Sequence, residues 1–163
     1  MNKILVSACL LGKRVRYDGK KLDVSGEILQ SLMKEECVVS VCPEVDAGMS
    51  IPRTPAEISG GDGDDVLLRR ASVITKTGED VTDIFTSGAN IALSLCMKHK
   101  IRVAILSESS PSCGSARIYD GQFSASKIDG VGVTTALLRQ HGIKVFNQFE
   151  IHKAHEALRQ AGG

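Results

Sequence analysis

The chain has 163 residues, of which 42% are hydrophobic and 24% charged, and its formal net charge is +1. This composition excludes an intrinsically disordered chain, and the length suits one compact domain better than a two-domain enzyme. The near-zero charge, with no Trp, two Tyr and four Phe, does not suit a large nucleic-acid surface and favours a small-molecule ligand. We therefore expect residues 1–163 to form a single domain.

Four short runs of apolar, largely β-branched residues predict buried strands. They are Lys3–Ala8, Val38–Val41, Arg102–Leu106 and Ile143–Phe146. Such runs are typical of parallel strands that are covered on both faces, because both faces then need apolar side chains. The sequence therefore predicts a mainly parallel sheet.

Helical patterns separate these runs. Ser25 is a candidate N-cap of a helix that reaches about Glu35, between the first two strands. Asp80 is a candidate N-cap of a longer helix, in which apolar residues recur at three- and four-residue spacing up to Lys98. This second helix leads into the third strand.

Two further helices are predicted in the last third of the chain. One covers Val133–Gln140 and would be stopped by Gly142 in a left-handed conformation, and the other covers Ile151–Gln160. Because parallel strands need crossover connections, the alternation of strands and helices predicts helices on both faces of the sheet. The expected fold class is α/β, a Rossmann-like three-layer fold.

Two segments do not follow this alternation, and a glycine pair invites a further reading. Pro43–Asp65 is rich in Pro, Gly and Asp and is predicted to be an ordered, functional loop over the sheet edge. Ala116–Ser124 contains Asp120-Gly121 between apolar residues, which predicts a β-hairpin. Gly130-Val131-Gly132 precedes a predicted helix but lacks the full G-x-G-x-x-G pattern, so we interpret it as a packing device and not as an anion site.

The N-terminal segment Val6-Ser7-Ala8-Cys9 imitates a lipoprotein cleavage box. The apolar stretch before the cysteine is nevertheless shorter than an export signal needs, and no stretch approaches the ~20 apolar residues that cross a bilayer. The five cysteines form an odd count, which argues against a disulfide framework. We therefore expect a cytoplasmic protein without a membrane span.

Three of the cysteines occupy equivalent places in the predicted topology. Cys9 follows the first strand, Cys42 follows the second, and Cys113 lies in the loop after the third. Ligands of open parallel sheets bind outside the carboxyl ends of the strands, so the three thiols are expected to converge there. Cys37 precedes a strand and Cys96 lies on the apolar side of a helix, and we assign both to the core.

Three converging thiols leave several chemistries open. Zinc is possible, although structural zinc sites usually have a fourth protein ligand and paired Cys-x-x-Cys spacing. An iron–sulfur cluster is normally held by four cysteines, so three would leave one iron without a protein ligand and available for chemistry. Thiol redox chemistry would need only two of the three.

Several motifs give the chain a family resemblance. Ser7–Gly12, Val41–Val45 and Ser110–Gly114, in this order, closely resemble the motifs of the thiouracil desulfidase family, and the likeness continues through Tyr17-Asp18-Gly19 and Pro52-Arg53. The resemblance implies a [4Fe-4S] cluster on the three cysteines, whose open iron binds the sulfur of a thiolated pyrimidine. It also implies a non-redox desulfuration of 2- or 4-thiouracil to uracil and sulfide.

The resemblance also nominates catalytic side chains. Glu44 matches the acidic residue of the Cys-Pro-Glu motif, and Ser110 and Ser112 match serines of the third motif. Attack by water needs a base and release of sulfide needs a proton, and Glu44 is placed to serve both steps. The alternative is that Glu44 only accepts backbone N–H bonds in the turn after the proline.

Two other classes of function compete with this enzyme. One is a non-catalytic iron–sulfur or zinc module that acts in sulfur trafficking or sensing, and the other is a thiol oxidoreductase. A carrier needs no acid or base in its pocket, so Glu44 and the polar segment Ser107–Ser112 favour the enzyme. The expected partners are a small thiopyrimidine and the iron–sulfur assembly machinery; a nucleic acid or a membrane is not expected.

Overall fold

The core of the molecule is a four-stranded sheet. A computed structural model describes residues 2–11 and 27–161 of the chain. The strands are β1 (Ile4–Ser7), β2 (Val38–Val41), β5 (Val103–Ile105) and β8 (Lys144–Phe146), in the order β2-β1-β5-β8. Every neighbouring pair is parallel. The predicted strands are confirmed, each within about two residues of its expected ends.

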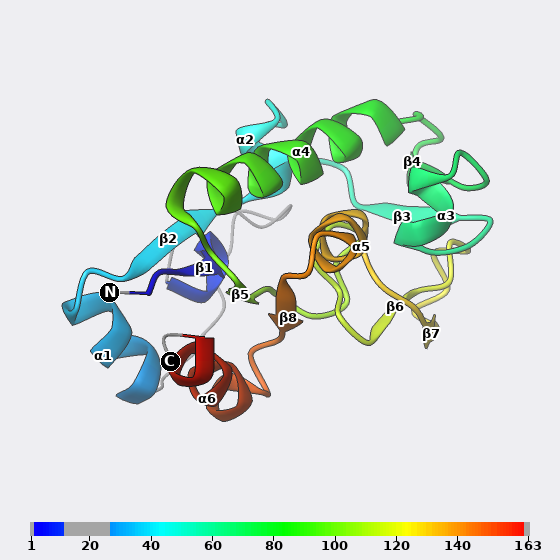
Figure 1. The fold of residues 1–163 in the computed structure, drawn as a ribbon. Helices are drawn as coiled ribbons and strands as arrows, with labels where there is room; N and C mark the ends of the chain where they lie inside the picture. Colours follow the sequence, from blue (N-terminus) through cyan, green and yellow to red (C-terminus); the bar gives the residue numbers. More distant parts are fainter. Residues whose placement is uncertain (1, 12–26, 162–163) are drawn as a thin grey trace.

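Helices cover both faces of this sheet (Figure 1). On one face, α1 (Glu27–Lys34) and α6 (Ile151–Ala161) enclose a core that includes Ile4 from β1. On the other face, α4 (Thr82–His99) and α5 (Val133–Gln140) enclose a core that includes Leu5 of the same strand. Successive side chains of a strand point to opposite faces, so β1 is buried on both sides. The expected three-layer α/β fold is confirmed.

The helix ends lie close to the sequence signals where the structure describes them, but the N-cap of α4 is Val81 and not the predicted Asp80. α4 begins at Thr82, two residues after the predicted cap, and Asp80 Oδ1 accepts a hydrogen bond from the Thr82 N–H at 2.9 Å. Gly142 has φ 79°, as expected for a residue that stops α5. The predicted cap Ser25 lies outside the described residues. None of the described helices is both long and apolar enough to cross a membrane.

The prediction of one ordered loop over Pro43–Asp65 is wrong. This segment contains a short helix, α2 (Pro43–Asp46), the strand β3 (Ala56–Ser59) and the start of α3 (Gly63–Leu67). β3 pairs antiparallel with β4 (Ser72–Thr75) in a separate two-stranded sheet. The sequence signal was weak because β3 and β4 carry polar residues at half of their positions, whereas the runs of the main sheet are largely apolar.

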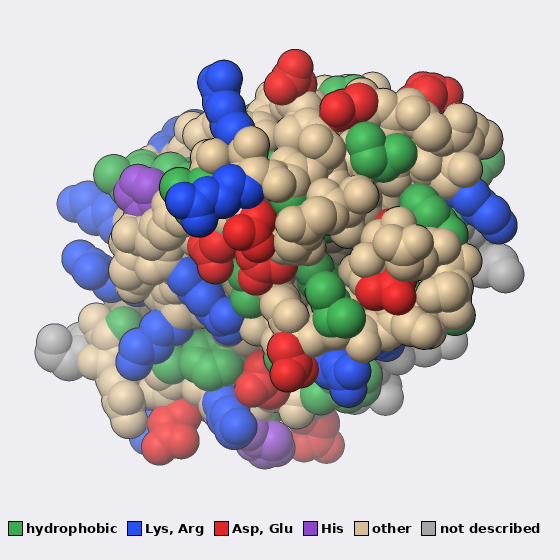
Figure 2. All heavy atoms as spheres, turned by 90° about the vertical axis from the view of Figure 1, so that its right-hand side faces the viewer, with side chains coloured by type: hydrophobic (Ala, Val, Ile, Leu, Met, Phe, Trp, Pro, Cys, Tyr) green, Lys and Arg blue, Asp and Glu red, His purple; other side chains and the backbone are tan. Residues whose placement is uncertain are grey.

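The predicted hairpin forms, but its turn is longer than expected. β6 (Arg117–Tyr119) pairs antiparallel with β7 (Lys127–Asp129), and residues 120–126 connect them. Asp120-Gly121 begins this connection and is not a two-residue turn, because the Asp120 N–H donates to the Ser126 carbonyl at 3.0 Å. Figure 2 shows the end of the molecule that carries the two small antiparallel sheets, where acidic, basic and hydrophobic side chains are interspersed.

Candidate active site

Three cysteines lie just beyond the ends of three adjacent strands. Cys9 lies in a 3-10 turn (Ala8–Leu11) that follows β1, and Cys42 follows β2 as the N-cap of α2. Cys113 lies in the loop after β5. All three line one cavity of about 380 Å³. The strands β2, β1 and β5 are neighbours in the sheet, which explains how residues so distant in the sequence meet.

The remaining two cysteines belong to the core, as expected. Cys37 is 2% exposed and its thiol donates to the Leu32 carbonyl at 3.1 Å. Cys96 is 1% exposed among the side chains between α4 and the sheet, and burial raises the pKa of its thiol to about 11. Neither residue lines the cavity, so both are structural.

The electrostatics of the cavity oppose ionisation of its thiols. Burial raises the pKa of Cys113 well above its usual value, and the negative charge of Glu44 raises it further. Burial is also the main cause of the raised pKa of Cys42. Without a cation the Cys42 and Cys113 thiols therefore remain protonated at neutral pH, and a metal that binds to these two sulfurs has to displace their protons.

The donor set matches a multi-iron cluster in its chemistry. Three soft sulfur ligands face one cavity, and thiolates are the ligands that iron–sulfur clusters use. Among residues 2–11 and 27–161, no three His, Cys, Asp or Glu side chains gather closely enough to hold a single metal ion. Ligands of a cluster do not need to meet at one point, because each cysteine binds a different iron.

Glu44 enters the same cavity and carries an ion pair. Its Oε2 lies 2.5 Å from Nη2 of Arg53, whose side chain is 5% exposed, while that of Glu44 is 18% exposed. Arg53 Nη1 also donates to the Ser50 carbonyl at 3.2 Å. The sequence placed Arg53 only within a family-like segment and did not reveal this pair, because the pair depends on the path of the chain after α2.

Helix α4 determines how closely the Cys-Pro-Glu segment approaches the sheet. Gly88 of α4 faces Pro43, and a Cβ at Gly88 would lie 2.4 Å from the Pro43 carbonyl oxygen. Only glycine therefore permits this contact between α4 and α2. Because Pro43 lies between Cys42 and Glu44, the contact fixes the position of both residues in the cavity.

The two serines of the third motif occupy different environments. Ser110 lines the cavity, and its Oγ accepts hydrogen bonds from the N–H groups of Ser112 at 3.0 Å and Cys113 at 3.1 Å. Ser112 does not line the cavity. Its hydroxyl is buried and has no hydrogen-bond partner among the described residues. The structure thus brings Ser110, and not Ser112, to the thiols.

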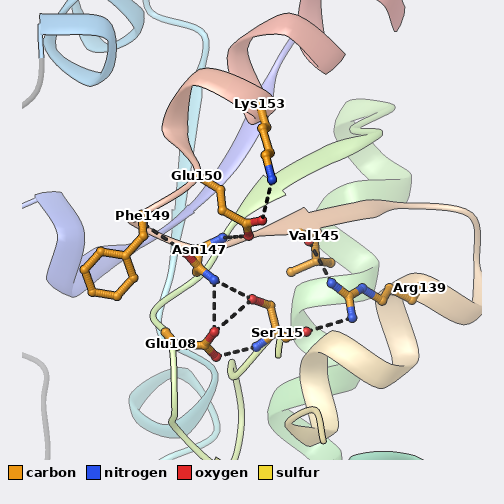
Figure 3. Close-up of polar contacts among 8 residues, drawn as sticks. All are labelled: Glu108, Ser115, Arg139, Val145, Asn147, Phe149, Glu150 and Lys153. Atoms are coloured by element: carbon orange, nitrogen blue, oxygen red, sulfur yellow. Dashed lines mark hydrogen bonds and ion pairs between the residues drawn. The ribbon is translucent and has the colours of Figure 1, made fainter. Parts of the chain in front are cut away.

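A buried network holds the loop that carries Cys113 (Figure 3). Asn147 Nδ2 donates to Glu108 Oε2 at 2.9 Å and to Ser115 Oγ at 3.0 Å. From α5, Arg139 donates to the Ser115 carbonyl at 3.0 Å and to the Val145 carbonyl at 2.9 Å. The network therefore joins this loop to α5 and to the segment around β8.

Glu108 is the acceptor at the centre of this network. Its Oε1 accepts the N–H groups of Ser109 at 3.0 Å, Ser115 at 2.8 Å and Ala116 at 3.3 Å. Burial alone would raise the pKa of Glu108, but these backbone donors outweigh it and hold the pKa below its usual value. The loop is thus organised around a carboxylate that stays ionised at neutral pH.

The N-terminus of α5 also binds the loop that carries Cys113, through backbone hydrogen bonds. The Val133 and Thr134 N–H groups donate to the Pro111 and Ser112 carbonyls, both at 2.8 Å. A Cβ at Gly132 would lie 2.4 Å from the Ser112 carbonyl carbon. This glycine is a packing device, as the sequence suggested, and it permits the loop to dock on the helix.

We predict that Gly132→Ala displaces Cys113 and lowers the iron content of the reconstituted protein, because the added methyl group overlaps backbone that cannot rotate away. Gly142→Ala, just beyond the other end of α5, is the control. A Cβ there meets nothing within 4 Å, although φ is 79°. The control should lose about 1 kcal/mol of stability and keep its iron. Equal iron content in both variants would contradict the prediction.

Comparisons with known proteins agree with this architecture. The family described as 2-thiouracil desulfurase matches residues 4–150. The uncharacterized protein YbbK of Bacillus subtilis (strain 168) is 46% identical over 149 residues, which cover 91% of this chain and 97% of YbbK. A solved structure described as the [4Fe-4S]-dependent thiouracil desulfidase TudS (DUF523Vcz) is 45% identical, with a TM-score of 0.89 over 98% of this chain and 99% of that one. The chain therefore belongs to the 2-thiouracil desulfurase family of enzymes.

Proposed function

We propose that this enzyme removes sulfur from thiolated pyrimidines of the 2- or 4-thiouracil type, with a [4Fe-4S] cluster held by Cys9, Cys42 and Cys113. The observation that carries the proposal is the cavity, in which three thiols from three strand ends face the Glu44 carboxylate. The likeness to the [4Fe-4S]-dependent thiouracil desulfidase supports the cofactor and the substrate class. The reaction consumes water and gives uracil and hydrogen sulfide, with no net change of oxidation state.

When bound, the cluster supplies an iron without a protein ligand, which prefers the soft thiocarbonyl sulfur to the pyrimidine oxygens and polarises the C=S bond. Glu44 accepts the proton of the attacking water and returns it to the departing sulfur. Arg53 orients the Glu44 carboxylate through their ion pair.

We assign Ser110 the role of a donor to the substrate. Its oxygen already accepts two backbone N–H groups, so the hydroxyl hydrogen is the part of the group that can interact with a ligand in the cavity. We assign no substrate contact to Ser112, because its side chain does not line the cavity.

An enzyme explains this cavity better than a sulfur carrier or sensor does, because a carrier has no use for a carboxylate and an arginine beside its cluster. None of the five cysteines, all of which lie within the described residues, forms a disulfide. We place the enzyme in the cytoplasm, where structural disulfides are rare. The iron–sulfur assembly machinery is the partner that would load the cluster.

Anaerobic reconstitution followed by incubation with 2-thiouracil and 4-thiouracil tests this function. We expect a brown protein with about four irons per chain, and release of one sulfide for each uracil formed. Iron-loaded protein that releases no sulfide from either compound would favour the carrier. Colourless protein that binds zinc, or metal-free protein with reactive thiols, would contradict the cofactor.

A further inference from the structure

The active-site cavity has a second wall, which contains neither the cysteines nor Glu44. Tyr119, Phe123 and Ala125 line it from the β6–β7 hairpin, and Glu57 lines it from β3. This wall is built from the two small antiparallel sheets, whereas the thiols lie at the end of the parallel sheet. The hairpin thus brings aromatic side chains to a cavity whose other side holds the reacting groups.

The connection at residues 120–126, called the 120–126 loop below, has an unusual backbone. Gly121, Phe123 and Ala125 all have positive φ, at 88°, 54° and 63°. Two of these residues carry side chains for which the left-handed region is unfavourable. Such a conformation persists only where the surroundings hold it.

Glu57 stabilises this conformation of the 120–126 loop. Its side chain is buried, with the residue 9% exposed, and its Oε1 accepts the N–H groups of Gly121 at 3.0 Å and Phe123 at 3.2 Å. A Cβ at Gly121 would lie 2.5 Å from the Ile58 carbonyl oxygen, so only glycine lets the 120–126 loop approach β3 this closely. A single carboxylate oxygen therefore fixes the backbone on both sides of Gln122, including that of Phe123.

We propose that the Phe123 ring stacks on the pyrimidine ring of the substrate and that Glu57 is a positioning residue that holds Phe123 in place for this contact. The proposal rests on the proposed function, because it assumes a pyrimidine in the cavity. Phe123 is half-buried and lines the cavity, so part of its ring is available to a ligand. A planar heteroaromatic ring gains affinity from an aromatic face whichever of its carbons bears the sulfur.

Substitution of Phe123 tests the stacking. In the cluster-loaded enzyme, Phe123→Leu should raise KM for 2-thiouracil and 4-thiouracil alike by about 5- to 150-fold, with little change in kcat, because stacking stabilises ground and transition states equally. Phe123→Tyr keeps an aromatic ring and should have a KM close to that of the wild-type enzyme. Phe149→Leu is the matched control, since Phe149 is 82% exposed and does not line the cavity.

Binding of uracil, measured anaerobically by calorimetry, gives a readout that does not depend on turnover. Phe123→Leu should weaken uracil binding by the same factor as it raises KM, with the visible absorbance of the cluster unchanged. If the wild-type enzyme releases sulfide but Phe123→Leu changes neither KM nor uracil affinity, the stacking is overturned and the proposed function stays intact. If uracil binding depends on Phe123 but the wild-type enzyme releases no sulfide, the stacking is supported and the proposed function is overturned.

Glu57 is tested through the backbone that it holds. Glu57→Leu should accelerate hydrogen exchange at the Gly121 and Phe123 amides and raise KM to the level of Phe123→Leu, whereas Glu57→Gln keeps an accepting oxygen and should change both much less. The KM of the double variant Glu57→Leu/Phe123→Leu should not exceed the higher of the two single-variant KM values, because both changes remove the same contact between Phe123 and the substrate. KM effects that multiply in the double variant, or unchanged exchange in a folded Glu57→Leu protein, would overturn the positioning role.

Discussion

Replacement of Cys113 by Ser is expected to abolish the intact cluster, so that the iron content of the reconstituted protein falls from about four per chain to near zero. Cys113 is 5% exposed and lines the cavity, so its replacement leaves Cys9 and Cys42 as the two cysteines that line the cavity. A hydroxyl oxygen is a harder and less acidic ligand than a thiol, and iron in a sulfide cluster prefers the softer one. Sulfide release from thiouracil should fall with the iron.

The core cysteines supply the controls for this experiment. Cys37→Ala and Cys96→Ala each remove a buried sulfur, which should reduce the free energy of unfolding by about 1 kcal/mol through lost packing while the iron content stays unchanged. Cys9→Ser and Cys42→Ser should behave like Cys113→Ser. Iron content that survives in Cys113→Ser would remove this residue from the ligand set and leave two thiols, which is too few for the proposed cluster.

Glu44→Gln is expected to keep the cluster and lose most turnover, with kcat lower by roughly 10²- to 10⁴-fold. The amide can still accept a hydrogen bond from Arg53, so the shape of the cavity is largely preserved. It cannot take up the proton that water releases on attack. The loss should therefore appear in kcat, with a much smaller change in KM.

Three measurements on Glu44→Gln separate the chemical role from a structural one. Iron analysis and the visible spectrum report the cluster, and thermal unfolding reports the ion pair, because Arg53 loses its charged partner in a mostly buried position. A variant that is less stable but has near-normal kcat would show that Glu44 serves to hold Arg53. The proton relay would then have to run through Ser110 or water.

The sequence was most informative where burial is continuous. The strands of the parallel sheet are apolar runs, and their ends predict where Cys9, Cys42 and Cys113 lie, because every parallel strand ends at the same edge. β3 and β4 escaped prediction because a short strand such as Ala56–Ser59 carries polar residues.

The active-site contacts that the sequence did not reveal join distant segments through single polar groups. The Arg53–Glu44 pair depends on the path of the chain after α2. The Glu57 carboxylate accepts hydrogen bonds from backbone N–H groups that lie more than 60 residues further along the chain. Backbone donors leave no mark in the side-chain pattern, so no periodicity could have indicated the second of these contacts. The two candidate serines differ for the same reason, since only the docking of their loop on α5 decides which one faces the cavity.

The strand order β2-β1-β5-β8 also determines when the three thiols of the cavity can come together during synthesis of the chain. β1 and β2 are translated early and are followed by Cys9 and Cys42, but Cys113 is translated only after α4 and β5. β5 then has to dock beside β1 before Cys113 can join the others. A nascent chain that ends before residue 113 lacks one of the three thiols of the cavity, so the proposed cluster could be completed only after most of the chain has been synthesised.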